Sequence, residues 1–197
     1  MAEVKYFAAH SLVSSKFKFS GDPVKMAFGT AIDTAISQHN YFTTRSFRNL
    51  RMQQIRNFSA VFRERLREEN VSIDRKVFEE HVKRAWRMIF AFSKTNVSNM
   101  LRERTRAVIV KGDPEIVMYT QPDFVDYEDF YEMKSFEITD PVQPEVLFQV
   151  KLFQLSFYGN ANIIGFREED GYYHAQIVPV PHLEDSEKRK LINDIFT

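Results

Sequence analysis

The chain has 197 residues, 44% of them hydrophobic and 14% aromatic, which allows a single domain with a substantial core. The 27 Lys and Arg residues balance the 27 Asp and Glu residues, and the absence of cysteine excludes disulfides, thiolate zinc sites and cysteine-held iron–sulfur clusters. No stretch approaches the ~18 consecutive apolar residues of a membrane helix, and residues 1–6 lack a signal-peptide pattern. We therefore expect an intracellular protein, cytoplasmic or nuclear, with no membrane partner.

The balanced net charge conceals an uneven distribution along the chain. Residues 41–111, called the basic segment below, contain 17 Lys/Arg against 7 Asp/Glu, a net of +10, and the rest of the chain carries −10. Such an asymmetry is expected where one part of a protein grips a polyanion and another holds metal ions. The alternative is that Arg-rich helices simply expose solvated faces. Charge alone favours polyanion binding only slightly.

A helix is predicted from about residue 24, because apolar residues recur at helical spacing as far as Ile36. Gly29 lies inside this helix. A helical glycine costs ~1 kcal/mol relative to alanine, so it often marks close packing or backbone approach. Asp33 follows one turn later, beside the apolar stripe. Taken alone, Asp33 is interpreted as a surface aspartate.

Two long charged helices are predicted next, over residues 44–69 and 75–95, followed by a short third helix over 97–104. His81 has no suitably spaced partner and is interpreted as a surface or packing histidine. A strand is then predicted at 107–110. Three cations lead into that strand, namely Arg102, Arg104 and Arg106.

The stretch around residues 116–138 is predicted to form a β-hairpin, with the turn at residues 126–129. Side chains alternate along a strand, so Glu132 and Lys134 share one face, where an ordinary half-buried strand would place apolar residues. Asp123 ends the first arm and lies near the start of the second. Two carboxylates and an ammonium that converge at a sheet edge can hold a divalent metal beside a charge-stabilising lysine.

A helix is predicted to begin at Pro144-Glu145 and to end at Gly159, and it should be buried because residues 146–159 are apolar nearly all round. Lys151, Gln154 and Tyr158 fall on one face, and Gln149 lies apart from them. Buried polar side chains need partners, so this face is interpreted as looking into a site. The alternative is a hydrogen-bonding stripe that braces the sheet. The remaining predicted elements are strands at 162–167 and 172–180 and a terminal helix at 183–196.

These pieces, taken together, resemble the PD-(D/E)xK nuclease superfamily, in particular its RecB-like branch, which includes lambda exonuclease. The pieces that carry the resemblance are Gly29…Asp33, Pro122-Asp123, Glu132-Met133-Lys134 and Gln154…Tyr158. The resemblance spans about residues 24–180 and implies an α/β (mixed α+β) fold. We therefore expect a restriction-endonuclease-like core with a central mixed β-sheet flanked by helices. The whole chain, 1–197, would form one nuclease-like domain, with 41–106 as an Arg-rich helical insertion.

The resemblance also implies the site and its cofactor. Mg²⁺ or Mn²⁺ would be held by oxygen ligands from Asp33, Asp123, Glu132 and the Met133 carbonyl. The catalytic set would be Asp123, Glu132, Lys134, Gln154 and Tyr158. Nucleic acid would contact Arg102, Arg104, Arg106 and Lys151. One departure concerns Asp33, because RecB-type nucleases usually carry histidine at that place, which leaves its role as a metal ligand open.

The function expected from the resemblance is metal-dependent hydrolysis of nucleic-acid phosphodiester bonds, with DNA favoured over RNA. Exonuclease and endonuclease action both stay open, and a lambda-like oligomer is possible. The first alternative is a catalytically inactive nucleic-acid-binding or assembly protein that keeps the nuclease fold, which Asp33 in place of histidine favours. A further alternative is a structural module whose Arg-rich helices bind an acidic protein.

Overall fold

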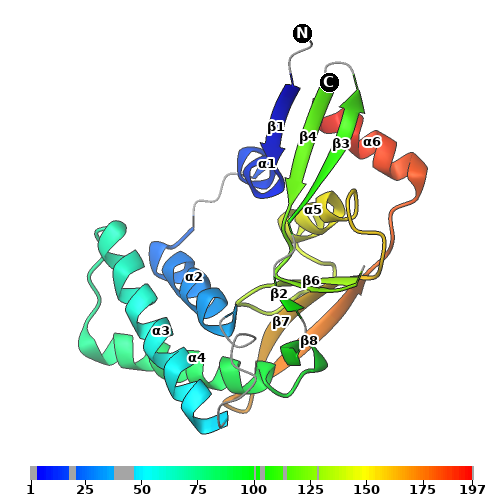
Figure 1. The fold of residues 1–197 in the computed structure, drawn as a ribbon. Coiled ribbons are helices and arrows are strands. Elements are labelled where there is room, and N and C mark those ends of the chain that lie inside the picture. The colour runs from blue at the N-terminus through cyan, green and yellow to red at the C-terminus, as the bar shows by residue number, and fades with distance from the viewer. Residues whose placement is uncertain are drawn as a thin grey trace.

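The computed structural model describes residues 4–17, 21–37, 47–99, 101–102, 105–112, 115–127 and 129–196. These residues form a mixed α/β structure with two mixed sheets and flanking helices (Figure 1). The strands are β1 (Val4–Ala8), β2 (Leu101–Arg102), β3 (Arg106–Gly112), β4 (Glu115–Thr120), β5 (Phe124–Asp126), β6 (Asp129–Met133), β7 (Ala161–Glu169) and β8 (Tyr172–Val180). The helices are α1 (Ala9–Lys16), α2 (Pro23–Ser37), α3 (Phe47–Glu68), α4 (Arg75–Phe92), α5 (Pro144–Phe153) and α6 (Asp185–Phe196), with a short 3-10 helix at Asn96–Asn99.

The strands divide between two sheets, where the sequence predicted one central sheet. The first has the order β1-β4-β3, and the second has the order β2-β5-β6-β7-β8. The division falls between β4 and β5, at residues 121–123. Pro122 lies there and is buried, and proline has no N–H to donate to a ladder. The predicted first hairpin arm is therefore two short strands with a bend that carries Asp123.

The predicted hairpin is present as β5 and β6, which pair in antiparallel fashion with Phe124 opposite Tyr131. The expected turn at residues 126–129 is too long, because Asp126 and Asp129 face each other within the ladder. Tyr127 follows Asp126 with a positive φ of 54°. The carboxylate of Asp129 accepts a hydrogen bond from the Asn160 backbone N–H at 2.7 Å, which ties the hairpin to the start of β7.

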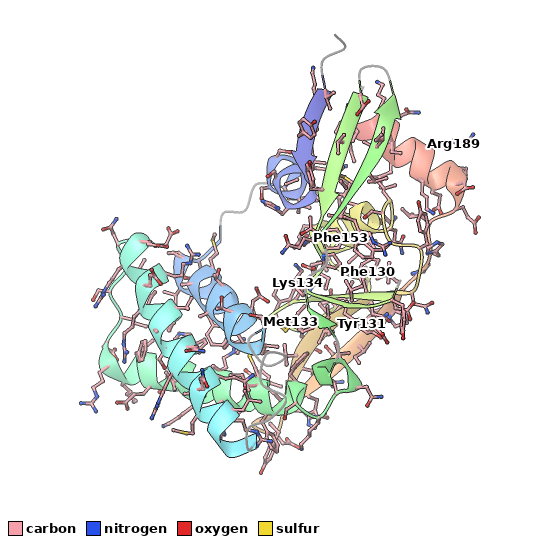
Figure 2. The ribbon with its side chains drawn as sticks, viewed as in Figure 1. Phe130, Tyr131, Met133, Lys134, Phe153 and Arg189 are labelled. Carbon is pink, nitrogen blue, oxygen red and sulfur yellow. The ribbon has the colours of Figure 1, made fainter. Side chains whose placement is uncertain are left out.

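Strand β6 lies between two hydrophobic clusters, and its side chains alternate between them as predicted (Figure 2). Phe130 is fully buried in the cluster that contains α5, and its ring lies 5.9 Å from that of Phe153. Tyr131 and Met133 contact the other cluster, which α2, α3 and α4 supply. Strand β7 pairs with β6 in parallel, and α5 makes the crossover between them.

Helices α2, α3 and α4 form a layer beside the five-stranded sheet (Figure 1). Their core is aromatic: the rings of Phe28, Phe58 and Phe62 pack within about 5–6 Å of one another. Asp74 begins α4 as an N-cap whose side chain accepts from the Val77 N–H at 2.8 Å. The described helices of the basic segment therefore share one core with α2 and the sheet.

Two predicted helices differ from the observed ones. The short helix expected over 97–104 is replaced by the 3-10 turn and the two-residue strand β2. The helix expected to reach Gly159 ends at Phe153, because residues 154–156 turn away. Among the described residues, no helix has both the length and the apolar character required to cross a bilayer.

Candidate active site

The candidate site lies at the end of β6, where the bend before β5 and helix α2 meet. A cavity of about 800 Å³ opens there, and its walls include Asp33, Asp123, Glu132 and Lys134. Met133 and Lys134 lie at the end of β6 next to α2 (Figure 2). The structure therefore brings together five of the predicted site residues, Asp33, Asp123, Glu132, Met133 and Lys134, which come from three separate parts of the chain.

The centre of the site is a charged network shielded from water. The Lys134 ammonium donates to Glu132 Oε1 at 2.7 Å and to Gln149 Oε1 at 2.9 Å. The Gln149 amide in turn donates to Glu132 Oε1 at 2.8 Å, which closes a triangle. Glu132 is only 4% exposed. Its second oxygen, Oε2, is buried and has no hydrogen-bond partner among the described residues.

Asp123 is held beside this network by the backbone, because its Oδ2 accepts from the Met133 N–H at 2.7 Å. Burial, together with the nearby carboxylates of Glu132 and Asp33, raises the pKa of Asp123 well above its ordinary value. The Lys134 charge and the Met133 hydrogen bond act in the opposite direction but do not cancel the rise. Asp123 therefore holds a proton more readily than an exposed aspartate does.

Lys134 has the complementary electrostatics. Burial alone would lower the pKa of this lysine, but the negative charges of Glu132, Asp123 and Asp33 outweigh burial and raise it. The side chain is 19% exposed and remains a cation at neutral pH. Lys134 is therefore suited to stabilise negative charge rather than to act as a neutral base.

Helix α2 reaches the site because Gly29 has no side chain. A Cβ at Gly29 would lie 3.2 Å from the Ser135 hydroxyl, just after the E-x-K residues. This close approach confirms the interpretation of Gly29 as a packing glycine. One turn later, Asp33 lines the cavity and adds its charge to the fields at Asp123 and Lys134, so it is not a simple surface aspartate.

The oxygen donors fit a hard divalent cation. The buried Oε2 of Glu132 has no hydrogen-bond partner among the described residues, and a buried carboxylate oxygen needs a cation or a donor beside it. Within the described ranges, however, no three His, Asp or Glu side chains are grouped closely enough to hold a metal by themselves. Proteins commonly bind Mg²⁺ through one or two carboxylates, with waters and substrate phosphates completing the shell.

Two predicted catalytic residues do not reach this cavity. Gln154 is fully buried, and its amide donates to the Pro181 carbonyl at 3.0 Å while its oxygen accepts from the Leu183 N–H at 3.1 Å. Tyr158 is 66% exposed and lies under the Lys188 ammonium. Because α5 ends at Phe153, the predicted shared face of Lys151, Gln154 and Tyr158 does not form. Gln154 instead braces the segment that follows β8.

Of the four cations predicted to contact nucleic acid, the structure describes the side chains of Arg106 and Lys151. Arg106 donates to the Ser156 carbonyl at 2.9 Å, and its guanidinium lies 4.3 Å from the Phe157 ring, so it packs against this chain. Lys151 is half-buried on α5. Arg102 belongs to β2, but its side chain, like all of Arg104, lies outside the described residues.

Sequence reasoning missed three side chains of the site. Gln149 was predicted to lie apart from the polar face of its helix, although its amide forms hydrogen bonds with both Glu132 and Lys134. His81 and Arg84, from α4, line the same cavity as the carboxylates. Burial and the Arg84 charge lower the pKa of His81, whose ring also packs against Phe28. A polar glutamine on a nearly all-apolar helix was the available signal for Gln149.

Comparisons with known proteins add little to this geometry. No family model matches the chain, and no curated protein matches it. A solved structure, described as "Crystal structure of SSO0001", aligns over 84% of this chain and 83% of its own. The identity is 11% and the TM-score is 0.32. A likeness at this level supports no conclusion about fold or function.

Proposed function

We propose that the protein is a metal-dependent nuclease that hydrolyses phosphodiester bonds of nucleic acid, with DNA favoured over RNA by the resemblance. The observation that carries the proposal is the buried Glu132–Lys134–Gln149 network with Asp123 beside it, all at one end of β6. A purely structural ion pair gains nothing from a second, partly buried carboxylate whose pKa is raised by burial and by the neighbouring carboxylates. A site that binds a cation and an anionic substrate does gain from such a carboxylate.

In this proposal Asp123, Glu132 and the Met133 carbonyl hold Mg²⁺ or Mn²⁺, with Asp33 as a further carboxylate at the cavity wall. The ion supplies Lewis-acid activation of water and stabilisation of the leaving oxygen. Lys134 places a fixed positive charge where negative charge develops on the phosphoryl oxygens. Gln149 fixes the positions of Lys134 and Glu132 through its two hydrogen bonds.

The basic segment supports an anionic substrate. Arg84 and His81 line the same cavity as the carboxylates, and exposed cations follow along α3 and α4. Phosphate contacts of this kind position a strand without reading its sequence. They also predict that binding weakens steeply with salt, because bound phosphates release counterions.

The test is incubation of linear and circular DNA and RNA with Mg²⁺, Mn²⁺ or EDTA. We expect cleavage with a divalent ion and none with EDTA. Survival of circular substrates while linear ones disappear would identify an exonuclease, and loss of both would identify an endonuclease. Absence of cleavage under every ionic condition would reject the proposal.

A second candidate is a non-catalytic nucleic-acid-binding protein, which is favoured by Asp33 at the place where RecB-type nucleases usually carry histidine. It predicts salt-sensitive nucleic-acid binding that is unchanged by Mn²⁺ and never accompanied by degradation.

A further inference from the structure

A second cavity, of about 680 Å³, opens farther along α4, where this helix packs against β8. Its walls come from the last turns of α4 and from the end of the β7–β8 hairpin. None of the residues that line it was assigned a functional role by the sequence; Trp86 and Phe90 were predicted to belong to the apolar stripe of their helix, and each is 37% exposed. We call it the aromatic cavity, because three exposed rings line it: Trp86, Phe90 and Tyr172.

These rings are more exposed than an ordinary folded surface favours. Trp86 and Phe90 are each 37% exposed, and Tyr172 is 72% exposed. They lie at one opening instead of being scattered singly, as most exposed apolar side chains are. Exposed ring faces at one cavity are a platform on which flat ligand groups can stack.

Cations accompany the rings. The Phe90 ring lies 4.7 Å from the Arg51 guanidinium and 4.3 Å from the Lys94 ammonium. Lys94 and Arg87 line the cavity, as does His174. The facing negative charge among the lining residues is Asp170, at the hairpin turn. Positive charge therefore predominates on the α4 wall, and the rings lie among the cations.

The two cavities are neighbours along one helix. His81 and Arg84 line the carboxylate cavity, whereas Trp86 and Phe90 line the aromatic one. At ~1.5 Å rise per residue, Arg84 and Phe90 are separated by roughly 9 Å along the axis. Arg84 also lies 5.9 Å from the ring of Tyr173, a wall residue of the aromatic cavity. The two cavities therefore lie close together along α4.

We propose that the aromatic cavity binds an unpaired nucleic-acid strand, whose bases stack on Trp86 and Tyr172 while Arg87 and Lys94 contact its phosphates. This assignment rests on the proposed function, because it names the substrate as a strand with exposed bases. A duplex hides its base faces, and an acidic peptide has none. Aromatic rings interleaved with cations are the combination that proteins use to bind single strands without sequence preference.

The experiment uses the chain's one tryptophan, Trp86, as its reporter. The full-length protein is titrated in EDTA, so that nothing is cleaved, with an oligothymidylate of about 15 nucleotides. We expect quenching of tryptophan emission on binding. A strand of equal length that lacks bases, and a duplex, should bind without comparable quenching. Equal quenching by the abasic strand, the duplex or polyglutamate, or no quenching at saturation, would overturn the proposal.

Variants separate stacking from simple phosphate attraction. Tyr172→Ala should weaken oligothymidylate binding about tenfold, within the range for loss of one stacked base. Tyr6→Ala is the matched control, because Tyr6 is also well exposed, at 62%, but belongs to the other sheet. Equal affinities of the Tyr172→Ala and Tyr6→Ala variants would contradict the proposal. Since binding is read without metal, failure of nuclease activity leaves this result intact, and the reverse also holds.

Discussion

Gln149 uses both ends of its amide to join a buried ion pair. Its oxygen accepts from Lys134, and its nitrogen donates to Glu132. A buried ion pair is favourable only when hydrogen bonds satisfy the remaining donors and acceptors of its members. Gln149 therefore fixes where the ammonium and the carboxylate lie. Gln154, five residues later, uses its amide to bind the backbone of Pro181 and Leu183.

The two glutamines give a paired prediction. Gln149→Ala should reduce nuclease activity by about 10- to 100-fold, the usual cost of removing a positioning partner, with a smaller effect on stability. Gln154→Ala should leave the buried Leu183 N–H unpaired and lower the free energy of unfolding by about 1–3 kcal/mol. Cleavage kinetics and denaturant unfolding of both variants check this. Equal effects of the two changes on activity would contradict the assignment of Gln149 to the site and of Gln154 to a structural role.

Asp123 predicts an unusual dependence of stability on pH. Its folded pKa lies above the ordinary value of 3.8, so between these two values the folded chain keeps a proton that the unfolded chain releases. Stability without metal therefore falls as pH rises through this window. Asp123→Asn removes the charge and should raise the Tm in EDTA at pH 8, by roughly 2–4 °C for each kcal/mol gained. The gain should shrink toward about pH 4.

Thermal unfolding of the wild type and of the Asp123→Asn variant, measured between about pH 4 and pH 8, tests this prediction. An Asp123→Asn variant less stable than the wild type at pH 8 would show that the carboxylate is ionised and well paired in the folded protein. The Met133 N–H can still donate to the asparagine oxygen, so loss of that hydrogen bond would not explain such a result.

Residue patterns predicted part of the site. Strand alternation placed Glu132 and Lys134 on one face, and they form an ion pair. Proximity across the hairpin placed Asp123 near them. Gln154 was predicted to face the site and Gln149 to lie apart from it, whereas the structure shows the reverse. The prediction failed because it depended on where a buried helix ends. A helix that is apolar all round shows neither which side faces the core nor where the helix ends. The sequence therefore does not determine where its few polar side chains point.

At the scale of elements, Gly165 controls how closely β7 approaches the chain after β6. A Cβ at this position would lie 2.5 Å from Ile138 Cγ1 and 2.8 Å from the Phe136 carbonyl oxygen. The Phe136 carbonyl also accepts from the Phe166 N–H at 2.9 Å, so it cannot move away freely. Gly165→Ala should therefore lower the free energy of unfolding by about 1–3 kcal/mol, as overpacking does.

Denaturant unfolding measures this cost, with Gly29→Ala as the comparison. A Cβ at Gly29 meets a single hydroxyl at 3.2 Å, and alanine also improves helix propensity. Gly29→Ala should thus be tolerated better than Gly165→Ala. The reverse order would contradict the packing described around β7.

Long periodic elements were predictable, and short ones were not. Helices α2 and α4 and strands β7 and β8 were expected close to where they occur. The two-residue strand β2 was predicted as part of a helix, because its only support is pairing with β5, which is distant in sequence. The bend at Pro122 that separates the two sheets was not predicted either, for the same reason. Tertiary contacts, which no local pattern contains, decide such segments.

At the scale of the whole molecule, α4 connects the carboxylate cavity, the aromatic cavity and the basic segment. One part of this helix lines the carboxylate cavity, and the next turns line the aromatic cavity. The helix belongs to the basic segment, and its buried face shares a core with the sheet that carries Glu132. The charge asymmetry of the sequence therefore corresponds to an acidic site at the end of β6 beside basic helices. This arrangement suits an anionic polymer held next to a cation.

The most direct test of the central claim is Mn²⁺-dependent cleavage by Glu132→Gln, measured beside oligonucleotide binding by the same variant. Glutamine keeps the shape of Glu132 and removes its charge, so the Lys134 and Gln149 hydrogen bonds can persist in part. We predict that cleavage is lost while folding and oligonucleotide binding remain. Undiminished cleavage by Glu132→Gln would contradict the assignment of this site.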